Sequence, residues 1–169
     1  IGLVVGGWYL IKKLQAPITI SRTVSPVSAA EANINAKYED VLKANQNYVE
    51  ITEGELTGLL ASYTVLHSDF PLKEGQVIVE ADKITINGVM LEPVKTQVTV
   101  DLYPQVVNGN LEMQILKISA GEVTLPSFLS KNIEQNITEV LKKAFSYPKI
   151  QITSVGLLSG KIRLTIQPI

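Results

Sequence analysis

The sequence predicts an α+β domain in which an antiparallel β-meander of about four strands and a C-terminal hairpin are covered by one long amphipathic helix. Two N-terminal helices and a transmembrane anchor are expected to precede them. Three observations support this: residues 76–118 largely alternate between apolar and polar, residues 128–145 carry an apolar stripe at helical spacing, and the chain begins with an uncharged apolar segment. Strands with one buried face are typical of antiparallel sheets, which a helix with one apolar stripe can cover.

The composition excludes several classes of protein and of site. A chain of 169 residues with 46% hydrophobic and 18% charged residues has enough apolar material for one folded domain. Its 15 basic and 16 acidic residues nearly cancel, so we expect no nucleic-acid partner. Because the chain has no cysteine and one histidine, thiol catalysis, thiolate zinc sites and multi-histidine metal sites are excluded, and we expect no metal and no cofactor.

The first eleven residues carry no charge and are followed by two lysines. Aromatic residues directly before lysines are typical of a membrane interface, so residues 1–14 are predicted to be the C-terminal part of a transmembrane anchor. A buried core helix and a signal-peptide remnant are the alternatives. The anchor residues are Leu3, Val4, Val5, Trp8, Tyr9, Leu10, Ile11, Lys12 and Lys13.

Proline, serine and threonine indicate a linker over residues 15–27, before a domain of residues 28–169. Ser28-Ala29-Ala30-Glu31 matches a capping box and predicts a helix that ends near Ala44. A second capping box, Thr52-Glu53-Gly54-Glu55, predicts a short helix with its leucines on one side.

The alternating segments predict the meander. Asn108-Gly109 lies between two of them and is typical of a type I′ hairpin turn. At residues 116–118 the apolar phase slips by one residue, which indicates a β-bulge. Gly121 is expected to end the meander, and residues 150–157 and 161–167 are expected to form the final hairpin around Ser159-Gly160.

The long helix is predicted from Pro126 until it stops before Tyr147-Pro148. Its apolar stripe is either plain core or the floor of a groove for an acyl chain. The groove residues would be Phe128, Leu129, Ile133, Ile137, Val140, Leu141 and Phe145.

Side chains that could perform catalysis are sparse, and we expect no catalytic residues. His67, Ser68 and Asp69 are consecutive, whereas the nucleophile and the acid of a triad must approach opposite nitrogens of the imidazole ring. A set of surface carboxylates leaves one alternative, a hydrolase or transferase, which requires convergence in one cleft of Glu53, Glu80, Asp82 and Glu92.

Several segments resemble small bacterial membrane-anchored proteins of the YpmS-like and LmeA-like kind. The similarity covers about residues 49–167. It rests on Ile51-Thr52-Glu53-Gly54-Glu55-Leu56-Thr57-Gly58-Leu59-Leu60, on the G-N-L … I-x-x-G-x-x-x-L-P pattern of residues 109–126, and on the closing hairpin. The resemblance implies an N-terminal anchor, a domain outside the cytoplasmic membrane and a relation to elongated lipid-binding sheets. It implies no catalytic residues, and residues 15–47 have no counterpart in it.

The sequence therefore predicts a non-enzymatic, single-pass, membrane-anchored extracytoplasmic domain. Such a domain would act as an accessory or structural subunit of a membrane protein complex, or it would bind a lipid or another hydrophobic ligand. Membrane lipid and integral membrane protein subunits are the expected partners. The residues indicate no specific activity.

Overall fold

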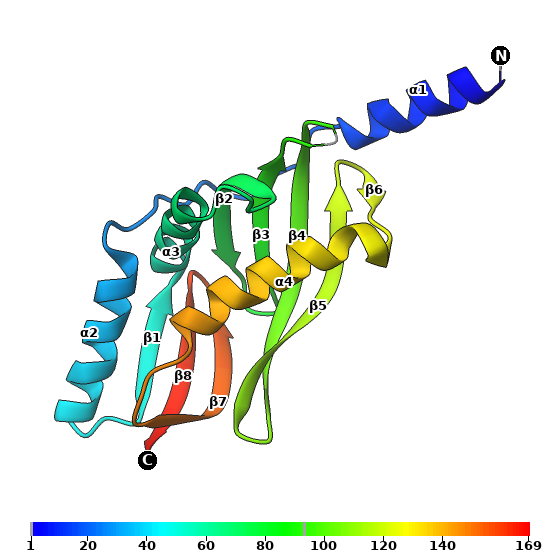
Figure 1. Cartoon of the computed structure of the whole chain (residues 1–169). Coiled ribbons are helices and arrows are strands. Elements are labelled where there is room, and N and C mark those ends of the chain that lie inside the picture. Colours follow the sequence, from blue (N-terminus) through cyan, green and yellow to red (C-terminus); the bar gives the residue numbers. More distant parts are fainter. Residues whose placement is uncertain (1, 93) are drawn as a thin grey trace.

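The computed structural model describes residues 2–92 and 94–169, which form four helices and two antiparallel sheets (Figure 1). The helices are α1 (Gly2–Leu14), α2 (Ala30–Lys43), α3 (Glu53–Leu66) and α4 (Ser127–Ala144). The smaller sheet has the order β1-β8-β7 and consists of β1 (Tyr48–Thr52), β7 (Ile150–Leu158) and β8 (Lys161–Pro168). The larger sheet has the order β2-β3-β4-β5-β6 and consists of β2 (Leu72–Val79), β3 (Ile84–Met90), β4 (Thr96–Val107), β5 (Asn110–Ala120) and β6 (Val123–Thr124).

One apolar core joins both sheets to three of the helices. Figure 1 shows α4 lying diagonally across the sheets, with α2 beside β1. Alternate residues of β4 (Val98, Val100, Leu102) and of β8 (Ile162, Leu164) are fully buried in this core. Burial of each such side chain stabilises the fold by about 1.5–3 kcal/mol, so packing of the two inner faces dominates the stability.

The start of α3 joins the two sheets. The predicted capping box is confirmed: the Thr52 hydroxyl accepts a hydrogen bond from the Glu55 backbone, and the Glu55 carboxylate accepts one from the Thr52 backbone at 2.8 Å. Lys37 on α2 forms an ion pair with the same carboxylate at 2.7 Å. The capping box predicted at Ser28 is wrong, because α2 begins at Ala30 after Ala29 in the left-handed conformation, without a side-chain cap.

The segment between α1 and α2 is bound along the body of the domain. Arg22 forms a bidentate pair with Glu53 (2.6 and 3.1 Å) and also donates to the Val79 carbonyl at 2.9 Å. The Val27 amide donates to the Gly54 carbonyl at 2.9 Å. The predicted linker is therefore held against α3 and β2 by specific contacts.

Helix α1 is attached to the large sheet by its C-terminal end and extends away from the body (Figure 1). The Lys13 carbonyl accepts a hydrogen bond from the Glu122 amide at 3.0 Å, and the Leu14 carbonyl accepts one from the Thr96 hydroxyl. In the middle of the helix, the side chains of Trp8 and Tyr9 are 61% and 60% exposed.

The prediction of a transmembrane helix is contradicted for the residues that the structure describes. Helix α1, Gly2–Leu14, is the segment to which this prediction applied. Among residues 2–92 and 94–169, no helix combines the length and the apolar character needed to cross a membrane. This finding contradicts the predicted single-pass membrane localisation.

The prediction of a four-stranded meander is also wrong, because the large sheet has five strands. Gly121 adopts a left-handed conformation (φ 55°) that reverses the chain, so Val123 and Thr124 pair with Ala120 and Ser119. The final hairpin likewise gains a third strand, β1, which pairs with β8. The predicted turn at Asn108-Gly109 and the bulge opposite Asp101/Leu102 are confirmed.

We predict that Gly58→Ala destabilises the fold by about 1–3 kcal/mol through overpacking. An added Cβ would overlap the Val27 carbonyl oxygen, because the linker lies directly on α3 at this position. Gly7→Ala is the matched helical control, since a Cβ there meets no described atom within 4 Å. Urea unfolding tests the difference, and equal midpoints for the two variants would contradict it.

We also predict an acid-sensitive contribution from Glu53. Burial acts to raise the pKa of this carboxyl, but hydrogen bonds from Arg22 and the Val79 amide, with the Arg22 charge, outweigh it and leave the pKa below its ordinary value. The contribution is therefore complete above the ordinary pKa of about 4.5 and is lost as the pH falls through the lower, folded-state value.

Glu53→Gln should cost about 1 kcal/mol at neutral pH, since Arg22 is partly exposed, and should weaken the loss of stability between pH 5 and pH 3. Glu134→Gln, on the exposed face of α4, serves as the control. The test is the free energy of unfolding of each variant, measured from pH 5 to pH 3. If this free energy falls equally with pH in the wild type and in Glu53→Gln, the prediction is refuted.

Candidate functional site

The structure places most of the predicted acyl-chain residues in the core. Ile133, Ile137, Val140 and Leu141 are at most 2% exposed and pack in the cluster shared by both sheets. Phe128 lies at the other extreme, 77% exposed, and the side chain of Leu129 lies outside the described part of the structure. The inner face of α4 is thus closed against the strands.

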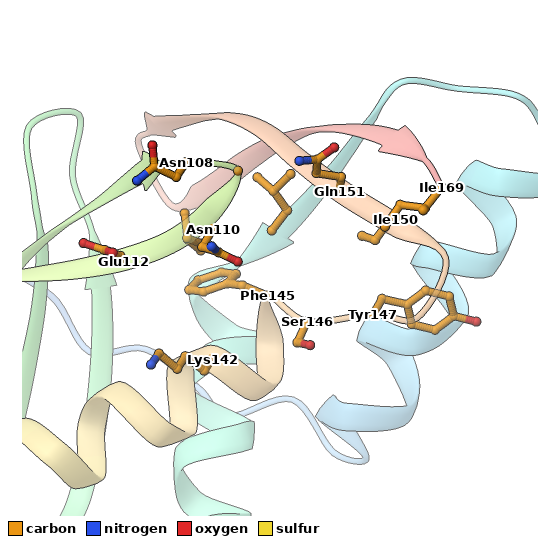
Figure 2. A pocket seen from close by; sticks show the side chains of 13 residues that line it. Asn108, Asn110, Glu112, Lys142, Phe145, Ser146, Tyr147, Ile150, Gln151 and Ile169 are labelled. Atoms are coloured by element: carbon orange, nitrogen blue, oxygen red, sulfur yellow. The ribbon is translucent and has the colours of Figure 1, made fainter.

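A groove of about 810 Å³ opens instead at the C-terminal end of α4 (Figure 2). Three parts of the chain form its walls: the tip of the β4–β5 hairpin, the segment from the end of α4 to β7, and the C-terminus. The lining residues are Asn108, Gly109, Asn110, Leu111, Glu112, Lys142, Phe145, Ser146, Tyr147, Ile150, Gln151, Ile152 and Ile169.

The groove combines apolar and polar chemistry. Figure 2 shows the Phe145 ring between α4 and Asn110 of β5, with Ile150 and Gln151 on β7 across from them. Lys142 on α4 and Glu112 on β5 bring opposite charges to its walls. Such a mixture is suited to a ligand that has apolar groups and hydrogen-bonding groups along its length.

Helix α2 holds the groove wall in position. The Tyr38 hydroxyl donates to the Ala144 carbonyl at 3.0 Å, and the Tyr38 ring stacks on Tyr147 with centroids 5.1 Å apart. Burial raises the pKa of Tyr38 well above its ordinary value, so the hydroxyl keeps its proton and remains a donor. The last turn of α4 and the Tyr147 ring are therefore fixed from behind.

One wall of the groove is the open edge of β7. The Ile169 amide donates to the Lys149 carbonyl at 3.0 Å, which places Lys149 and, two residues on, Gln151 in the pairs that bond to β8. The backbone N–H and C=O groups of Ile150 and Ile152 consequently point away from β8. In the part of the chain that the structure describes, they bond to no other group.

Unlike the β7 edge, the edge of β2 has hydrogen-bond partners from side chains. The Thr57 hydroxyl accepts from the Val77 amide at 2.9 Å, and the Glu53 carboxylate accepts from the Val79 amide at 3.1 Å. The Val79 carbonyl accepts from Arg22 and from the Gly160 amide. Side chains of α3 and the linker thus complete the hydrogen bonds of this edge.

Two other edges are partly completed. On β1, Lys37 donates to the Glu50 carbonyl and the Glu55 carboxylate accepts from the Thr52 amide. On β5, the short strand β6 covers the end at Ser119 and Ala120. The opposite end of β5, near Leu111, borders the groove.

The candidate catalytic carboxylates do not gather in one cleft. Glu53 is paired with Arg22, and the charge of Glu80 also acts on this arginine; Glu80 and Asp82 lie in the β2–β3 turn at the same end of the sheet. Glu92 follows the other end of β3, whose seven residues span about 20 Å. His67 stacks on Tyr63 with centroids 4.0 Å apart, and no group of three metal-binding side chains occurs in residues 2–92 and 94–169.

Sequence reasoning missed the groove because its walls come from three separate parts of the chain. Phe145 is the one predicted groove residue that borders it. One sequence feature could have indicated the groove wall. Residues 150–158 form a strand without charged residues or proline, which are the residues that commonly protect an edge strand.

Comparison with known proteins gives no assignment: no family model matches this chain, and no curated protein matches it. The resemblance to YpmS-like and LmeA-like proteins stays a prediction.

We predict that Thr57→Val destabilises the fold by about 1–3 kcal/mol, because the change keeps the volume but leaves the Val77 amide without its acceptor. Hydrogen exchange of the Val77 amide should accelerate, while that of Val79, bonded to Glu53, should change less. Thr64→Val on the same helix is the control and should stay within about 0.5 kcal/mol of wild type. An unchanged Val77 exchange rate would disprove side-chain completion of this edge.

Proposed function

We propose that this chain is a non-enzymatic binding domain that holds an elongated, partly apolar ligand in the groove at the end of α4. The groove carries this proposal. Its volume of about 810 Å³ lies within the range of about 300–1,000 Å³ that is typical of ligand sites. Its walls are also supported by well-packed elements, since Tyr38 fixes the end of α4 from behind.

The packing beneath α4 favours this groove over an internal lipid tunnel. The apolar stripe that could have lined such a tunnel is buried, with Ile137 and Val140 at 0% and 1% exposure. A close-packed interior has no room for an acyl chain unless the helix separates from the sheet. A ligand is therefore expected to bind at the end of α4, where Phe145 and Leu111 meet polar side chains.

An accessory role, in which the domain binds a segment of a partner molecule, agrees with this geometry. Glu53 is bound by Arg22, and Glu92 lies at the other end of β3 from Glu80 and Asp82, so the alternative of a hydrolase or transferase receives no support from a shared cleft of all four carboxylates. Binding requires a shaped and chemically mixed surface, which the groove provides.

The proposal is tested with two probes, oleate and a phage-displayed library of random twelve-residue peptides. At least one of them should bind the wild-type protein. Ser146→Trp should weaken that binding about tenfold or more, because Ser146 is exposed on the groove wall and an indole would fill the space. Ser68→Trp is the control, since Ser68 is also an exposed loop serine but lies outside the groove.

Titration calorimetry and phage enzyme-linked assays give the affinities. Failure of both probes to bind the wild-type protein would refute the proposed function. Equal binding by the wild type and Ser146→Trp would refute the location.

A further inference from the structure

We propose that the ligand of this groove is an extended polypeptide, which binds as an added strand along the N-terminal half of β7. The inference rests on the proposed function and specifies its ligand class. It is carried by the backbone groups of Ile150 and Ile152, which point toward the groove and have no partner among the described residues. An added strand offers N–H and C=O groups at the matching spacing.

The contrast with the other edges supports a polypeptide. At β2, side chains from Thr57, Glu53 and Arg22 bond to the edge groups, and at β5 a short strand covers one end. Folded proteins generally protect their edge strands with charges, prolines or covering elements. β7 has no charged residue and no proline along its whole length. Its first three residues border the groove, whose facing wall includes the tip of the β4–β5 hairpin beside Gln151.

The extent of pairing is limited by the bulge in β7. The register with β8 shifts between Ile152 and Ser154, so the regular edge before it comprises residues 150–152. An added strand would form up to four backbone hydrogen bonds there, two with Ile150 and two with Ile152. Its alternate side chains would face Phe145 and Leu111 across the groove.

A single strand suits this edge better than a second folded copy. The tip of the β4–β5 hairpin reaches β7, where an added Cβ on Gly109 would overlap the Gln151 side chain. The groove is thus bounded by β5 on the side toward which the edge of β7 faces. Two whole domains aligned edge to edge would meet this hairpin, whereas a single extended segment is narrower than a folded domain.

Peptides selected on the wild-type protein provide the test. The best binder is synthesised in two N-methylated forms, with the methyl groups on alternate residues, because in a β-strand alternate amides point to opposite sides. Strand addition predicts that one form binds at least about tenfold more weakly, while the other retains its affinity.

Hydrogen exchange supplies a second readout on the protein itself. On peptide binding, the amides of Ile150 and Ile152 should exchange at least about tenfold more slowly. Gln151 is the internal control, because its amide already faces β8 and should change little. Analytical ultracentrifugation of the free protein should show a monomer.

Several outcomes separate this inference from the proposed function. Binding of oleate alone, equal effects of the two N-methylated forms, or unchanged exchange at Ile150 and Ile152 would each overturn strand addition, while groove binding that Ser146→Trp blocks would still stand. A dimer that protects Ile150 and Ile152 without peptide would show that the occupant is a second copy. If neither probe binds, the proposed function and this inference fall together.

Discussion

The need of every strand edge to satisfy its backbone hydrogen bonds organises this molecule. Unpaired N–H and C=O groups cost free energy when they are removed from water, so an edge must be exposed, covered or completed by side chains. The large sheet completes its β2 edge through Thr57, Glu53 and Arg22. The small sheet leaves β7 open where the chain forms a groove. The two sheets therefore differ in their edges: side chains complete the β2 edge, whereas the start of β7 borders the groove.

The first turns of α3 show how few residues can join distant parts of a chain. Glu53 bonds to the linker and to β2, and Glu55 bonds to the preceding strand and to α2. Thr57 completes the β2 edge from the next turn. Glu53 and Glu55 lie in the first turn of the helix, where acidic side chains interact favourably with the helix dipole. Helix capping by Thr52 and Glu55 and completion of the β2 edge by Glu53 and Thr57 therefore come from neighbouring residues at one helix start.

Much of the fold could be predicted from local patterns, and the misses have physical causes. The capping box at Thr52, the Asn108-Gly109 turn and the bulge in β5 depend on neighbouring residues, so they were readable. The strands β1 and β6 were missed because each is short and is stabilised by a partner distant in sequence or by a left-handed glycine. The apolar start of the chain resembled a membrane segment in composition, but no helix among the described residues is long and apolar enough to cross a membrane.

The sequence by itself determined the helices, most strands, the tight turns and the sparse supply of catalytic side chains, because periodicity and capping act within a few residues. Only the tertiary structure decided how the stripe on α4 is used, since burial depends on what lies opposite. It likewise decided which strand edge remains open. Hydrogen bonds from Thr57 and Glu53 complete one edge, and the meeting of Phe145, Leu111 and Ile150 forms the groove at another. These residues lie far apart in sequence, and only the folded backbone brings them together.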